Sequence, residues 1–363
     1  MPGNVGDERV HASRLHQAHD WTERSARYRV LSERLRNLRD DQLESLLEGT
    51  TGSVVGVGGT TGKLVVEGVP VFVKKVPLTD LELRAEHADS TANLFQLPMF
   101  YHYGIGSAGF GARREVDVHV MTTRWVLDEL FHGFPILYHH RVLPQVPQPI
   151  DEPELDRWVT YWEGSPSVRA RLEAIGRASA AVVLFMEHIP YTVDSWLSAQ
   201  TAEGGQVAES AYRLVDRSLR RGVEFMGSRG LLHFDAHFHN LLTDGHRVYF
   251  ADFGLAIHSG FDLHADESAF LRRHGSYDRC YTVTHLAQWL ISNLLRIPWS
   301  DCPDYIREYA RSDRPIDLPE SAARIIARSA PVAAIMMDFY GKLQKLSKRT
   351  PYPADDLSRT LHR

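Results

Sequence analysis

The apolar positions at the start of the chain recur at helical spacing. Within the charged residues 1–48, four residues mark one face of a helix: Tyr28, Leu31, Leu35 and Leu38. Asp40 or Asp41 is placed to cap a second, shorter helix that carries the leucines of residues 43–47. We interpret the segment as an amphipathic extension that packs on the main domain.

After this extension the pattern becomes typical of strands. Residues 53–76, SVVGVGGTTGKLVVEGVPVFVKKV, are rich in valine and glycine, and a Glu67-Gly68 pair separates two apolar runs. Such a pair favours the tight turn of a β-hairpin, so we expect strand, glycine-rich loop, strand, turn and strand. AAVVLFMEHIP, residues 180–190, predicts a further strand, whereas the proline-rich residues 135–155 indicate a loop.

Beyond residue 190 helical spacing returns. One helix is marked by four residues on a single face: Ala211, Val215, Leu219 and Val223. Another is marked by apolar residues between positions 332 and 346. A strand-rich first part and a helix-rich second part predict an α+β protein of two unequal lobes, and the cleft between such lobes is a natural small-molecule site.

Composition narrows the class of protein. The 363 residues suffice for one large two-lobed domain or two ordinary ones. A formal net charge of −5 disfavours a nucleic-acid binder, and two cysteines, Cys280 and Cys302, cannot form a disulfide framework. The amino terminus lacks the apolar core of a signal peptide, and no window holds 18 uninterrupted apolar residues. We expect a cytoplasmic protein that binds neither nucleic acid nor membrane. The composition does not determine the oligomeric state.

The densest group of chemically active side chains lies in GLLHFDAHFHNLLTDGHRVYFADFGLA, residues 230–256. His233, Asp235, His237 and His239 alternate, so on an extended strand they would share one face and could bind zinc or iron. Their order matches no spacing typical of a metal site. A metal-dependent hydrolase using the three histidines therefore stays a minor alternative.

A different interpretation accounts for more residues of this stretch. Asp235 is followed by Asn240, then by an Asp244-Gly245 hairpin turn, and then by Asp252-Phe253-Gly254. This arrangement resembles the catalytic loop and the metal-binding hairpin of the protein-kinase-like superfamily. The resemblance covers roughly residues 50–260.

The resemblance implies a two-lobed protein-kinase-like fold, with a small antiparallel-sheet N-lobe and a mainly helical C-lobe. Residues 1–48 would be a helical extension and residues 49–187 the N-lobe, with an insertion at 77–111. Residues 188–363 would form the C-lobe, which carries the catalytic loop and the Asp-Phe-Gly motif.

The resemblance also implies chemical roles. Asp235 would orient the acceptor hydroxyl and accept its proton. Asn240 and Asp252 would hold Mg²⁺ against the phosphates of ATP, since amide and carboxylate oxygens are the ligands that this ion prefers. His237 would lie beside the transferred phosphate, where a protonated imidazole would stabilise negative charge.

A phosphate-covering loop is expected upstream. VVGVGGTTG, residues 54–62, lies between two predicted strands, and backbone N–H groups around Gly58, Gly59 and Gly62 could approach phosphates closely. The run is not a P-loop, because leucine follows Lys63, and it does not fit G-x-G-x-x-G.

A lysine and a glutamate should accompany this loop. Lys74 and Lys75 are adjacent on a strand and face opposite ways, so one of them can reach the phosphates; we favour Lys74 narrowly. We expect its partner to be Glu115 in RREVDVHVMTTRWVLDEL, with Glu86 as the alternative. The following HGFPILYHHRVL resembles the strand that comes after the glutamate helix in kinases.

The linker between the lobes is expected at AVVLFMEHIPYTVDSWL, residues 181–197. By position, Met186 would be the gatekeeper, and the backbone of Glu187 and of Ile189 would face the adenine edge.

Several departures from protein kinases bear on the acceptor. The motif reads His-Phe-Asp, without the arginine that anchors a phosphorylated activation loop, and no A-P-E motif follows Gly254. His237 stands where protein serine/threonine kinases usually carry lysine. A histidine at this position is similar to antibiotic and choline phosphotransferases. About 110 residues remain after Gly254, a short run for a platform that docks proteins. The motif Asp-Phe-Gly-Leu-Ala, by contrast, resembles that of protein kinases more than that of aminoglycoside phosphotransferases.

We therefore predict an ATP- and Mg²⁺-dependent phosphotransferase that acts on a hydroxyl of a small molecule. A protein serine/threonine kinase with a degenerate substrate lobe is the first alternative and a nucleotide-binding pseudokinase the second, because fold membership does not set the substrate. The acceptor and the choice between ATP and GTP stay open.

Overall fold

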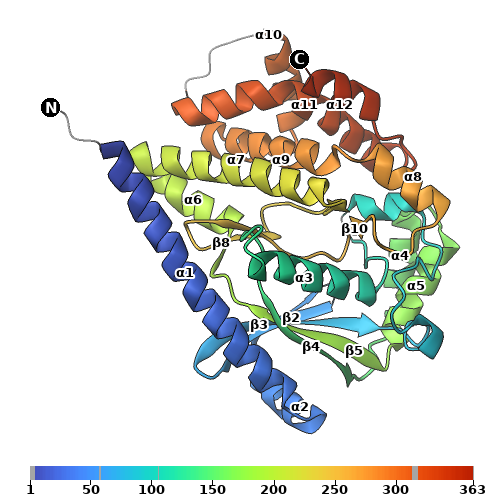
Figure 1. Cartoon of the computed structure of the whole chain (residues 1–363). Helices are drawn as coiled ribbons and strands as arrows, with labels where there is room; N and C mark the ends of the chain where they lie inside the picture. The colour runs from blue at the N-terminus through green and yellow to red at the C-terminus, as the bar shows by residue number, and fades with distance from the viewer. Residues whose placement is uncertain (1–4, 57–58, 105, 313–317, 363) are drawn as a thin grey trace.

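The computed structural model describes residues 5–56, 59–104, 106–312 and 318–362. It has an antiparallel sheet of five strands near the amino terminus, followed by a mainly helical region (Figure 1). The α+β class and the two-lobed layout predicted from the sequence are therefore confirmed. Among the described helices, none combines the length and the apolar character needed to cross a membrane.

The sheet has the strand order β1-β2-β3-β5-β4, and all its neighbouring strands are antiparallel. Its strands are β1 (Thr51–Gly56), β2 (Gly59–Val66), β3 (Val69–Leu78), β4 (Leu137–Pro144) and β5 (Ala180–Glu187). The predicted turn between β2 and β3 is confirmed, with φ of 49° at Glu67 and 76° at Gly68, as a type I′ turn requires.

Helices cover both faces of the sheet. On one face lie α1 (Val5–Arg36) and α2 (Asp40–Glu48), whose buried leucines share a core with Val71 and Val73 of β3. On the other lies α3 (Ala112–Leu127), between the sheet and the helical region (Figure 1). Because β3 alternates, Val71 and Val73 face α1 and α2, whereas Lys74 faces α3.

The helical region is built around long helices with one apolar face. Its members are α6 (Val193–Glu203), α7 (Gly205–Ser228), α8 (Ala265–Arg273), α9 (Tyr277–Leu295), α10 (Cys302–Ser312), α11 (Glu320–Lys345) and α12 (Ala354–Leu361). The two helices predicted here are α7 and α11, and α11 begins well before the pattern indicated. The core of this region contains apolar side chains of α7, α9 and α11.

Short strands bracket the motif-bearing loops in the helical region. They are β6 (Tyr191–Thr192), β7 (Leu231–Leu232), β8 (Leu241–Thr243), β9 (Val248–Phe250) and β10 (Ile257–His258). β8 and β9 form the hairpin predicted around Asp244-Gly245, where Gly245 has a φ of 88°. β7 pairs with β10, so the residues on either side of both motifs are held in small sheets.

Two insertions pack on each other beside the sheet. The first, residues 79–111, contains the short 3₁₀ helices η1 (Ala85–His87) and η2 (Met99–Tyr103). The second, between β4 and β5, contains α4 (Glu152–Tyr161) and α5 (Pro166–Arg177). They share a buried cluster of apolar residues that includes Tyr101, Phe110, Trp162 and Leu172.

Three local predictions are wrong. Residues 135–155 are not a loop throughout, because β4 and the start of α4 lie within them. Asp151 caps α4 by accepting from the Glu154 N–H at 2.8 Å. The proline in the first turn is compatible with the helix, because the N–H that it lacks would have no partner there.

The expected cap of α2 is also off by one position, since Arg39 occupies the N-cap and both aspartates lie in the first turn. The glycine-rich loop is shorter than residues 54–62, because β1 runs to Gly56 and β2 starts at Gly59.

Candidate functional site

Three charged side chains from distant parts of the chain meet between the sheet and the helical region. The Nζ of Lys74 lies 2.6 Å from Oε1 of Glu115 on α3 and 2.8 Å from Oδ1 of Asp252, which follows β9. Lys74 and Glu115 are buried. The structure thus brings together the lysine, the glutamate and the Asp-Phe-Gly aspartate that the sequence singled out.

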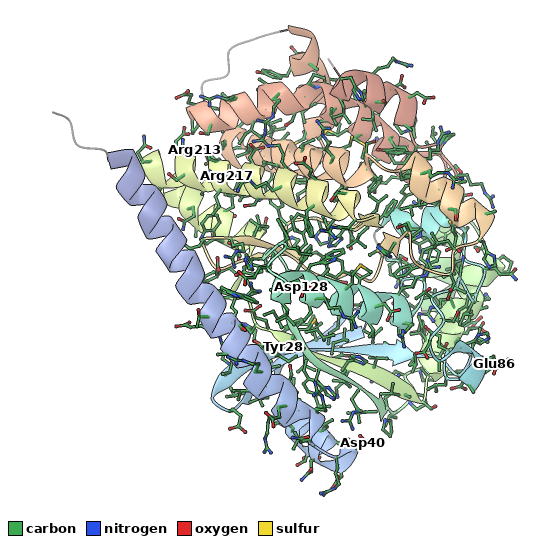
Figure 2. The ribbon with its side chains drawn as sticks, viewed as in Figure 1. Tyr28, Asp40, Glu86, Asp128, Arg213 and Arg217 are labelled. Carbon is green, nitrogen blue, oxygen red and sulfur yellow. The ribbon has the colours of Figure 1, made fainter. Side chains whose placement is uncertain are left out.

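The alternation of β3 explains why Lys74 takes this position. Lys75 points to the opposite face of the sheet, toward α1 and α2, and is half-buried. The alternative partner, Glu86, is exposed on η1 at the periphery of the molecule (Figure 2). Neither side chain takes part in the cluster.

Electrostatics keep this cluster charged. Burial would lower the pKa of Lys74, but the carboxylates of Asp252 and Glu115 outweigh it and raise the pKa. Burial would raise the pKa of Asp252, but the Lys74 ammonium outweighs it and lowers the pKa to about 2. An ammonium and an ionised carboxylate therefore face the cleft at neutral pH.

A cavity of about 290 Å³ opens in front of these groups. Lys74 and Asp252 form one wall, and Phe72 of β3 and residues 186–189 at the end of β5 form others. The remaining lining mixes apolar residues such as Pro135 and Leu242 with polar ones that include Lys63 and Asn240. The end of β5 thus borders the cavity where the sequence placed the linker between the lobes.

Asn240 lines this cavity, and its side chain faces Asp235. Nδ2 of Asn240 donates to Oδ2 of Asp235 at 2.9 Å and to its backbone oxygen at 3.1 Å. Within the described residues, Oδ1 of Asn240 has no hydrogen-bond partner. An amide oxygen and the ionised Asp252 carboxylate thus line one cavity, and they are oxygen donors of the kind that Mg²⁺ takes.

Asp235 is tuned toward neutrality. Burial, and then the negative charge of Asp252, raise the pKa of Asp235 to about 7, against the effect of the Asn240 hydrogen bond. A carboxylate with a pKa near the working pH is well suited to accept a proton from a bound alcohol.

The loop that carries Asp235 is anchored by a buried carboxylate that the sequence analysis missed. Asp278 on α9 accepts from the His233 N–H at 2.6 Å and from the Phe234 N–H at 3.0 Å. Phe234 has a φ of 65°, a left-handed conformation that costs free energy for a non-glycine residue and needs such support. An aspartate near the start of a largely apolar helix was the available signal.

A series of edge-on and tilted ring contacts connects α3 to this loop. Phe253 lies between His119 and His233, with centroid separations of 5.1 Å and 4.9 Å. His119 is fully buried, and burial lowers its pKa to about 3. Both of its ring nitrogens lack hydrogen-bond partners within the described chain, and the residue lines the 290 Å³ cavity. The sequence analysis also missed His119, one turn after Glu115.

The histidines of the motif do not form a metal cluster. His233 uses both ring nitrogens on the backbone, with Nε2 2.9 Å from the Ala251 oxygen and Nδ1 3.3 Å from the Asp235 nitrogen. The rings of His237 and His239 lie 5.8 Å apart. In the part of the chain that the structure covers, no three His, Cys, Asp or Glu side chains are grouped to hold a metal ion.

His237 lies beside Asp235, with 3.7 Å between its Nε2 and Oδ1 of the aspartate. Burial lowers the pKa of His237, which disfavours the protonated imidazole when no phosphate is bound. Its expected place beside the transferred phosphate stays a prediction.

The three glycines predicted to bind phosphate do not share one loop in the structure. Gly59 has a φ of 131°, and a Cβ there would lie 2.0 Å from the Lys75 carbonyl oxygen, so only glycine fits. Gly62 lies within β2, opposite Val73. Gly58 falls outside the described residues.

The end of β5 is tied to the amino-terminal helix. Nε and Nη2 of Arg24 donate to the two oxygens of Glu187 at 2.9 Å and 2.7 Å, and Nη2 also donates to the Phe134 oxygen at 2.8 Å. Both side chains of the pair are almost completely buried. The Glu187 side chain is therefore engaged with α1, a contact that no local pattern announced.

Residues 99–111 cover the Asp-Phe-Gly loop. Nδ1 of His102 lies 2.9 Å from the Leu255 oxygen, and Gly109, with a φ of 71°, packs on the backbone of Gly254. A buried ion pair of 2.7 Å between Arg114 and Glu267 joins α3 to α8. The insertion therefore supports the loop from the side of the molecule that carries α4, α5 and α8 (Figure 1).

The fold and the site define a two-lobed α+β protein whose cleft is lined by a Lys–Glu–Asp cluster and an adjoining Asp–Asn pair. Comparison of the chain with known protein families finds no family model that matches, and no curated protein matches it either.

Proposed function

We propose that the protein is an ATP- and Mg²⁺-dependent phosphotransferase that moves the γ-phosphate to a hydroxyl of a small molecule. The observation that carries the proposal is the position of Lys74 between Glu115 and Asp252, with Asn240 lining the same cavity and bonded to Asp235, which lines an adjoining one. Such an arrangement offers positive charge, metal ligands and a proton acceptor within one cleft.

The chain's own residues fit a bound nucleotide and metal ion. The Lys74 ammonium would bind phosphate oxygens, and Asp252 with Oδ1 of Asn240 would hold Mg²⁺. The metal ion would neutralise charge on the phosphates. Phe72 and Met186 provide apolar surface for the base, next to the backbone of Glu187 and Ile189. Lys75 and Gly62 have no role in this arrangement.

Asp235 is the residue we place at the acceptor. Its carboxylate would orient the hydroxyl and take up its proton, and its pKa of about 7 is matched to that task. Asn240 holds the carboxylate in place through a bond of 2.9 Å, and His237 lies next to it. Asp278 keeps the loop in its strained conformation.

The surroundings of the site support a small acceptor. Residues 255–264 after the Asp-Phe-Gly motif form a short connection to α8, and Asp262 accepts from the Thr91 N–H at 2.9 Å. This segment is packed against the first insertion rather than extended toward a protein substrate. We place the reaction in the cytoplasm, where Cys280 and Cys302, both buried and unbridged, would stay reduced.

The test is transfer of the labelled γ-phosphate of ATP to a panel of small alcohols in the presence of Mg²⁺. Replacing Asp235→Asn should lower the transfer rate by about 100-fold or more while nucleotide binding persists, because the proton acceptor is lost and the phosphate site is kept. Asp128→Asn, at an exposed position after α3 (Figure 2), is the matched control and should transfer at the normal rate. An unchanged rate in Asp235→Asn, or transfer to proteins but not to small alcohols, would contradict the proposal.

A further inference from the structure

A second cavity, of about 560 Å³, borders the catalytic loop on the other side of Asp235. Asp235 and His237 line this second cavity, Lys74 and Asp252 line the first, and His239 lines both. Its remaining walls come from α9, from α11 and the residues that follow it, and from the two insertions. An alcohol in the second cavity would therefore meet Asp235 at the border between the two.

The walls of this second cavity are unusually rich in flat rings. Tyr277 and Tyr281 are stacked with an interplanar angle of 9°, and His285 continues the series beside Tyr281. Trp299 lies 5.3 Å from the His285 ring. Stacked rings of this kind offer a broad apolar surface to a ring-shaped ligand.

One phenol on this wall is open to a ligand. Among the described residues, the hydroxyl of Tyr281 has no hydrogen-bond partner, although the neighbouring Tyr277 hydroxyl is paired with Tyr340 at 2.6 Å. Tyr281 and Asp235 both line the second cavity. A polar group and an aromatic face are thus presented together, close to the catalytic carboxylate.

The charges that line the second cavity disfavour a cation. Asp235 is the one carboxylate among its described lining residues, which also include Lys345 and Lys348. Lys348 is only 8% exposed, and its Nζ donates to the Leu343 oxygen at 3.1 Å and lies 3.9 Å from the Tyr161 ring centroid. Within the described chain, no carboxylate forms an ion pair with this ammonium, which has three hydrogens to donate, although Glu163, bonded to the Lys348 backbone N–H, partly offsets the effect of burial on its pKa.

We propose that the second cavity is the acceptor site, and that its acceptor is a ring-bearing alcohol without an ammonium group, such as a sugar or a glycoside. The ring would lie on the Tyr281–His285 wall, since Tyr277 behind it is only 1% exposed, and the reacting hydroxyl would face Asp235. Aromatic faces also attract cations, but two lysines against one carboxylate make a positively charged acceptor unfavourable in a partly desolvated cavity. This inference rests on the phosphotransferase function proposed above.

The test compares two glycosides that differ in one group, phenyl β-glucoside and its 2-amino counterpart phenyl β-glucosaminide. Their binding to the protein loaded with Mg²⁺ and a non-hydrolysable ATP analogue is measured by calorimetry. The neutral glycoside should bind at least about tenfold more tightly. Lys348→Gln should reduce the ratio of the two affinities, and Lys345→Gln, the second variant, should do the same. Lys342→Gln is the control, because Lys342 is exposed on α11, and it should leave the ratio unchanged.

Tyr281→Leu provides a further test of the ring wall and should weaken binding of the neutral glycoside by about tenfold. Equal or tighter binding of the amino sugar, binding of neither glycoside, or unchanged ratios in both lysine variants would overturn the acceptor assignment. The nucleotide analogue itself is titrated first in each case. Its failure to bind the unaltered protein would instead count against the proposed function, so the two failures are distinguishable.

Discussion

At the scale of single residues, the site depends on close approaches that only certain side chains allow. Gly109 lies so near the Asp-Phe-Gly loop that an added Cβ would be 2.4 Å from the Gly254 carbonyl oxygen. The Gly254 N–H donates to Oδ1 of Asp252 at 3.4 Å. A methyl group at position 109 would therefore displace the backbone that positions Asp252.

Gly109→Ala should lower the rate of phosphate transfer by at least about tenfold, since a misplaced Asp252 no longer meets Lys74 and the metal ion. Gly204→Ala is a matched control, because Gly204 has the same φ of 71° and an added Cβ there meets no atom within 4 Å. Both variants carry a backbone strain on the order of 1–3 kcal/mol, because Gly204 also has a ψ of −168° that side chains rarely adopt, and urea unfolding measures this strain in each. Equal activity in the two variants would show that the close contact with Gly254 does not matter.

At the scale of elements, α1 holds one residue of the cavity wall in place. Its Arg24 binds both oxygens of Glu187 at the end of β5, and the pair is almost fully buried. The same helix carries Arg34, whose ion pair with Glu67 is about half exposed, at 53% and 50%. The two arginines lie on one helix, and their ion pairs differ mainly in burial.

Arg24→Met should destabilise the protein by about 3–5 kcal/mol, because it leaves the buried Glu187 carboxylate unpaired. Arg34→Met should cost less than about 1 kcal/mol, as is usual for an exposed pair. Urea unfolding of both variants measures the difference. If the double variant Arg24→Met/Glu187→Met is as unstable as the sum of its single changes, the two side chains are not coupled and the account of α1 fails.

At the scale of the whole molecule, local patterns predicted the parts of the fold that local physics decides. The Glu67-Gly68 turn and the meander were readable because turn residues and strand alternation act over a few positions. α4 was missed because its prolines suggested a loop, although a proline at the start of a helix is compatible with it. The residues of the candidate site were predicted from two local motifs, the loop that carries Asp235 and Asn240 and the hairpin that precedes Asp252.

The contacts that support the site were not predictable in this way. Arg24 and Glu187 are 163 positions apart, and His119 acquires its neighbour Phe253 from the loop after β9. Pairings of this kind leave no periodic trace in the sequence. The same holds for the second cavity, whose walls combine α9, α11 and both insertions.

The central claim, a Mg²⁺-dependent nucleotide site built on Lys74 and Asp252, is tested most directly by thermal unfolding. A ligand that binds the folded state raises its stability by mass action, by about 2.7 kcal/mol at a concentration 100 times its Kd. We predict that ATP or GTP with Mg²⁺ raises the Tm, and that Asp252→Asn loses this effect while Asp128→Asn keeps it. No rise with any nucleotide, or the same Mg²⁺-dependent rise in Asp252→Asn, would contradict the account.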